Sequence, residues 1–78
     1  MNKINLAECK LNKEYFIVEV DIENEKLKKH LEHLFIKKGE RISIIKKSYK
    51  SKAYIVKVLG INYAIELSIC LKVFVYDI

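Results

Sequence analysis

The side chains of this sequence that could bind a metal ion are two histidines and two cysteines. His30 and His33 are three positions apart, so on a helix their imidazoles would be neighbours and could share one transition-metal ion with a third ligand. Cys9 or Cys70 could supply that ligand if the fold brings either to the helix. The alternative is that the imidazoles are solvated among lysines and that both cysteines are reduced thiols packed in the core. We therefore assign no metal ligand and keep His30, His33 and Cys70 as the candidates.

A basic run, KKSYKSK, extends from Lys46 to Lys52 and contains four lysines around Tyr49. Lysines that contact phosphates and an aromatic ring that stacks on a base are typical of nucleic-acid binding. The alternative is a hairpin tip whose lysines discourage edge-to-edge aggregation of strands. The net charge of +5 favours an acidic partner without naming one. Because the sequence has no arginine-rich motif and no RNA-binding aromatic strand, nucleic-acid binding through this hairpin is the alternative function only.

Other features limit the classes of protein to which the chain can belong. We find no nucleophile–base pair, no phosphate-binding glycine loop and no zinc-knuckle spacing, and the carboxylates are scattered, so we predict no enzymatic activity. The 78 residues fit a single domain, 1–78. The apolar runs are strand-sized and the N-terminus lacks a secretory signal, so we expect a cytoplasmic protein.

Alternating apolar residues predict a mainly β fold, a small barrel of antiparallel strands. In the first strand we expect Phe16, Val18 and Val20 to face the core. Gly60 marks a tight turn before the fourth strand. We predict about five strands, at Glu14–Asp21, Glu40–Lys47, Ala53–Val58, Tyr63–Leu67 and Lys72–Ile78.

One α-helix is predicted, inserted after the first strand, from Glu23 to Phe35. Its leucines, at positions 27, 31 and 34, follow helical spacing and form one apolar stripe. Asn24 can cap the first turn. The helix therefore depends on docking this stripe against the sheet, and Gly39 then occupies a turn position that needs a positive φ.

The order of these elements resembles the FeoA family of ferrous iron transport proteins over about Leu6 to Val75. The stretch LAECKLNKEYFIVEV is similar to the family's lead-in and first strand, and LFIKKGERISI to its helix end and turn, with Gly39 at the turn glycine. GINYAIEL is similar to its later strand, with Gly60 and Ala64. Cys70, Val73 and Val75 fit the last part of the pattern.

Three positions depart from the family pattern. Phe35 stands where the family usually has glycine, Lys38 where it has proline, and Glu66 where it often has a basic residue. Because phenylalanine disfavours positive φ, we expect the helix to end without such a residue and Phe35 to pack with the helix leucines.

The resemblance implies an SH3-like barrel that is a cytosolic accessory or regulatory protein of ferrous iron uptake. It would be a protein-interaction module for the cytosolic domain of the membrane transporter FeoB, and would meet the membrane only through that transporter. The family is often labelled metal-binding, which would make Fe²⁺ or another divalent transition metal its ligand; nucleic acid is not expected. The residues that we predict to contact the partner are Leu27, Leu31, Leu34, Lys46, Lys47, Tyr49 and Lys50.

Overall fold

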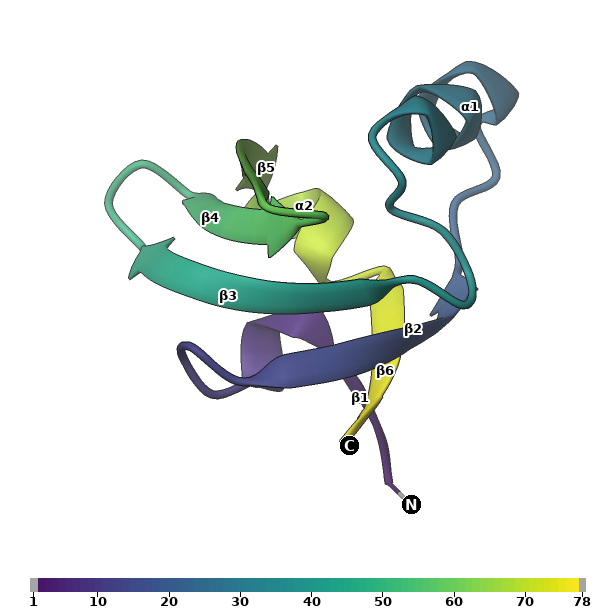
Figure 1. The fold of residues 1–78 in the computed structure, drawn as a ribbon. Helices are drawn as coiled ribbons and strands as arrows, with labels where there is room; N and C mark the ends of the chain where they lie inside the picture. Colours follow the sequence, from purple (N-terminus) through teal and green to yellow (C-terminus); the bar gives the residue numbers. More distant parts are fainter. Residues whose placement is uncertain (1, 78) are drawn as a thin grey trace.

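The computed structural model describes residues 2–77, which form one antiparallel sheet of six strands with three short helical segments (Figure 1). Along the sheet the strand order is β1-β6-β2-β3-β4-β5, so β1 and β5 are the edges. The strands are β1 (Lys3–Asn5), β2 (Glu14–Val20), β3 (Arg41–Ser48), β4 (Ala53–Val58), β5 (Ile61–Glu66) and β6 (Val73–Asp77). The helical segments are η1 (Leu6–Glu8), α1 (Glu25–His33) and α2 (Leu67–Cys70).

The mainly β fold is confirmed, as is a helix inserted after the first long strand. Strand β1 was not predicted, because its three residues show no usable alternation and form a strand only by pairing with β6. The helical turn α2 lies where a short connection was expected between the last two predicted strands, and it also includes Leu67, which was predicted to end a strand. Ile78, at the end of the predicted last strand, lies outside the described residues.

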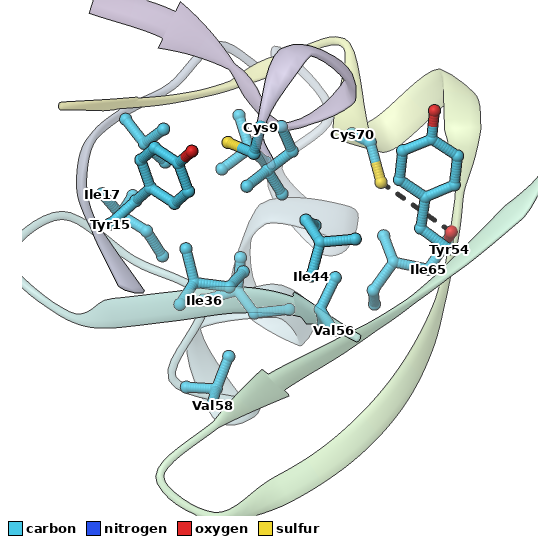
Figure 2. Close-up of a cluster of buried hydrophobic side chains, with 14 of the residues drawn as sticks. Cys9, Tyr15, Ile17, Ile36, Ile44, Tyr54, Val56, Val58, Ile65 and Cys70 are labelled. Atoms are coloured by element: carbon cyan, nitrogen blue, oxygen red, sulfur yellow. Dashed lines mark hydrogen bonds between the residues drawn. The ribbon is translucent and has the colours of Figure 1, made fainter. Parts of the chain in front are cut away.

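Two irregularities in strand register help the sheet to curl around its core. The pairing of β2 with β6 shifts between Ile17 and Glu19, and that of β3 with β4 shifts between Ile44 and Lys46. Such bulges increase local twist and bend the strand. The curled sheet encloses a single cluster of apolar side chains, part of which is shown in Figure 2.

The inward face of β2 was predicted wrongly. Tyr15 and Ile17 are buried, whereas Phe16 is exposed on the outer face. The Tyr15 hydroxyl accepts a hydrogen bond from the Lys10 main-chain N–H at 2.9 Å, so its polar end is satisfied within the fold. The bulge after Ile17 changes the alternation, which is why Val20 nevertheless packs against the core.

The end of α1 was also predicted wrongly. Phe35 has a φ of +63° and its side chain is 45% exposed. The N–H of Phe35 donates to Glu32 O and the N–H of Ile36 donates to Leu31 O, each at 2.9 Å, which is the Schellman pattern. This reversal buries Ile36 in the same core as Leu31, and that burial offsets the strain at Phe35.

The turn that follows is the one predicted. Gly39 has a φ of +95°, and the N–H of Glu40 donates to Lys37 O at 3.2 Å, as a type II turn requires. Two further hydrogen bonds attach the turn to β2. Gly39 N–H donates to Ile17 O at 2.8 Å, and Ile17 N–H donates to Glu40 O at 2.9 Å. The route from α1 into β3 is therefore fixed at both ends.

Replacing Phe35 tests this helix end. Phe35→Gly and Phe35→Ala remove the same ring, but only glycine adopts a positive φ without a Cβ penalty. We expect Phe35→Gly to be more stable than Phe35→Ala by about 1 kcal/mol in urea unfolding. If the alanine variant is as stable as the glycine variant, the helix does not end in a left-handed residue.

Candidate functional site

The three leucines of α1 are not equivalent in the structure. Leu31 is only 1% exposed and belongs to the core, and it also lies at the base of the groove described below, so its contact with a partner stays a prediction. Leu27 and Leu34 are half-buried and pack against the same core at its margin. The helix thus anchors itself through Leu31 and leaves its two other leucines accessible.

These two leucines line a groove of about 340 Å³ between α1 and the end of the sheet. Its other walls are His30 of α1, Tyr63 and Glu66 of β5, and Ile69 of α2. The sequence analysis missed Tyr63 and Ile69. Tyr63 was placed on a strand without a role, and Ile69 reaches the groove only because α2 turns the chain back after β5. The groove is therefore a mainly apolar concavity that includes the predicted leucines.

The lysine hairpin does not join this groove. In Figure 1 the β3–β4 connection lies at the left of the molecule and α1 at the upper right, so the predicted partner surface is divided into two. Lys47 donates to Ala7 O at 3.0 Å, and its ammonium is 5.7 Å from the centre of the Tyr54 ring. Tyr49 is exposed and meets Tyr54 edge-on at 6.0 Å. Lys46 and Lys50 are exposed.

The candidate metal ligands are not brought together. His30 and His33 are exposed on α1, and no group of three or more His, Cys, Asp or Glu side chains in residues 2–77 is placed to hold a metal ion. Cys9 and Cys70 are almost completely buried. The Cys70 thiol donates to Ile65 O at 3.8 Å (Figure 2).

Burial also sets the protonation of both thiols. It raises the pKa of Cys9 to about 12 and that of Cys70 to about 11, because the core does not solvate a thiolate. Thiolate is the form that binds metals and reacts with electrophiles. Both cysteines therefore behave as small core residues, consistent with their packing.

Residues 4–77 match the sequence model of the FeoA domain. The chain belongs to the FeoA domain family. This family is associated with ferrous iron transport. No curated protein sequence matches the chain. None of the helices within residues 2–77 is long and apolar enough to cross a membrane.

Solved structures share this FeoA fold at low sequence identity. An iron uptake regulatory protein (FeoA) is 17% identical, with a TM-score of 0.82 and full coverage of both chains. FeoA of Stenotrophomonas maltophilia, solved with zinc and described as an SH3 domain protein, is 22% identical with a TM-score of 0.78, over 94% of this chain and 89% of that one. ScaR with bound Zn²⁺ is 24% identical with a TM-score of 0.81, over 96% of this chain but 37% of that one. The predicted SH3-like class is therefore confirmed.

The buried thiols predict how stability depends on pH. A group whose pKa is raised by folding releases its proton more easily when unfolded, so its contribution is complete below the unfolded pKa near 9 and is lost as the pH rises towards the folded pKa. Between about pH 9 and 11 we expect the free energy of unfolding to fall by roughly 1 kcal/mol per pH unit for each thiol. A Cys9→Ala/Cys70→Ala variant, unfolded in urea over the same pH range, should lose this part of the slope. An unchanged slope would show that the thiols are not buried as described.

Proposed function

We propose that this FeoA-family chain is a cytosolic, non-enzymatic accessory protein of ferrous iron uptake that binds the cytosolic domain of a FeoB-type transporter. The observation that carries the proposal is the groove between α1 and β5, where Leu27, Leu34 and Ile69 are accessible at the margin of the core. Concave surfaces with an apolar lining and a few polar groups are the usual binding sites of small domains.

One feature of the groove and one description of a similar protein support a protein partner. His30 and Glu66 supply polar groups at its borders, which suits a protein surface of mixed character. The S. maltophilia FeoA is described as possibly acting as a ferrous iron transport activating factor, which is the role that an accessory protein would have.

The lysine hairpin is the alternative contact surface. Lys46, Lys50 and the exposed Tyr49 are available there, whereas Lys47 already bonds within the domain. We therefore place the main partner contact at the groove and expect the hairpin to contribute charge attraction alone. Nucleic-acid binding at the hairpin stays an untested alternative, and its affinity would fall steeply with salt.

Alanine replacements on the groove test the proposal. With the cytosolic domain of the matching FeoB-type transporter as partner, Leu27→Ala should weaken binding about ten-fold in calorimetric titration, because a half-buried leucine in a contact is worth over 1 kcal/mol. Leu11→Ala is the matched control, since Leu11 is an exposed leucine that lies outside β5 and does not line the groove. Absence of binding by the unmodified protein at about 100 μM would refute the proposed function.

A further inference from the structure

The edge strand β5 lacks the features that usually protect the edge of a sheet. It has six residues, pairs with β4 without a bulge, and contains neither lysine nor proline. Its only charged residue is Glu66, at its end. The opposite edge, β1, has three residues, and Lys3 forms an ion pair with Glu19. Of the two edges, β5 is therefore the template on which a further strand could pair.

The turn before β5 indicates which main-chain N–H and C=O groups of β5 form hydrogen bonds with β4. Leu59 and Gly60 form a two-residue turn, and both have a positive φ, as in a type I′ hairpin. In such a hairpin the flanking residues, Val58 and Ile61, exchange hydrogen bonds. Every second pair along the β4–β5 ladder then does the same.

The other end of the hairpin agrees with this alternation. Leu67 N–H donates to Lys52 O at 2.8 Å. Counting every second pair from Val58 and Ile61 along the ladder reaches this pair, so it is hydrogen-bonded as the alternation predicts. The N–H and C=O groups of Asn62 and Ala64 therefore point away from β4. Both residues are exposed, and no hydrogen bond from elsewhere in residues 2–77 reaches these main-chain groups. They are free to pair with a strand that lies alongside β5.

The groove is lined by β5 residues on this side, and a stripe of two lysines and two histidines of α1 borders it. Lys26, Lys29, His30 and His33 are spaced so that they share one side of the helix, and all are exposed. His30 also lines the groove. A segment lying between α1 and β5 would thus meet the apolar side chains of the groove and, along the helix, the ammonium groups of Lys26 and Lys29.

We propose that this edge and groove bind an extended, acidic segment of a partner protein, which joins the sheet next to β5 as an added strand. Alternate apolar side chains of the segment would enter the groove near Leu34 and Ile69, and its carboxylates would face Lys26 and His30. This proposal rests on the proposed function and specifies how the partner binds. A second copy of this chain fits less well, since it brings the same positive charge and a net charge of +5.

Hydrogen exchange of individual amides tests the added strand. The probe is a capped seven-residue peptide of alternating glutamate and valine, and the control peptide has lysine in place of glutamate. With the acidic peptide, exchange of Asn62 and Ala64 should slow by about ten-fold or more, whereas Ile61 and Tyr63 are already bonded to β4 and should change less. The lysine peptide should have no effect. Unchanged exchange at Asn62 and Ala64, or protection confined to the hairpin at 48–52, would overturn the proposal.

Two charge reversals on α1 test the acidic character of the segment. Lys26→Glu removes positive charge from the stripe, and Lys28→Glu makes the same change in net charge on another side of the helix. At low salt, Lys26→Glu should weaken binding of the acidic peptide about five-fold and Lys28→Glu by less than about two-fold. Equal effects would show that only net charge matters and that the stripe does not contact the segment.

Repeating the exchange experiment with the transporter domain separates this inference from the proposed function. If the domain binds without protecting Asn62 and Ala64, the added strand is wrong and the proposed function stands. If the acidic peptide protects both amides but the domain does not bind, the strand-addition site stands and the proposed function is wrong.

Discussion

The burial of Leu31 and Ile36 in one core is the constraint on which the arrangement of this domain depends. Leu31 is the buried residue of α1, and Ile36 follows it after a sharp reversal of the chain. The turn at Gly39 then bonds to β2, so the helix is fixed between its own last turn and the start of β3. With α1 held in this way, Leu27 and Leu34 pack at the margin of the core and line the groove between the helix and β5.

Several residues other than glycine are left-handed, and Phe35 is one of them. Asn12, Phe35, Lys52 and Leu59 all have a positive φ, and the chain has only two glycines and no proline. Each of these positions lies at or beside the end of a helix or strand, where the pairing of the flanking elements dictates the path of the chain. Strain of this kind persists only where surrounding contacts determine the conformation. In this domain the sheet and core impose the turns, rather than the turn residues directing the sheet.

This order of causes shows which features could be predicted from the sequence. Alternation in β3 and β4 agrees with the structure, because Ile42 and Ile44 alternate with less buried neighbours in β3, as Val56 does in β4, and all three are buried. Alternation failed in β2, where Tyr15 competes with Phe16 for the inward face and a bulge changes the phase. The prediction for Phe35 failed for another reason. Its positive φ accompanies the burial of Ile36, which the residue type at position 35 does not reveal. Predictions from the local sequence therefore succeeded where the local preference of a segment agreed with its packing in the fold.

The candidate site was less predictable than the fold for a related reason. Helical spacing identified Leu27, Leu31 and Leu34 as one stripe, but spacing does not reveal how deeply each residue of a stripe lies in the core. Depth depends on how α1 packs on the sheet, where Leu31 and Ile36 are buried on either side of the reversal at Phe35. Ile69 could not be included at all, since α2 brings it to the groove only after β5 is complete. The groove is thus a product of chain geometry, because it forms between a helix anchored at its end and the edge strand of the sheet.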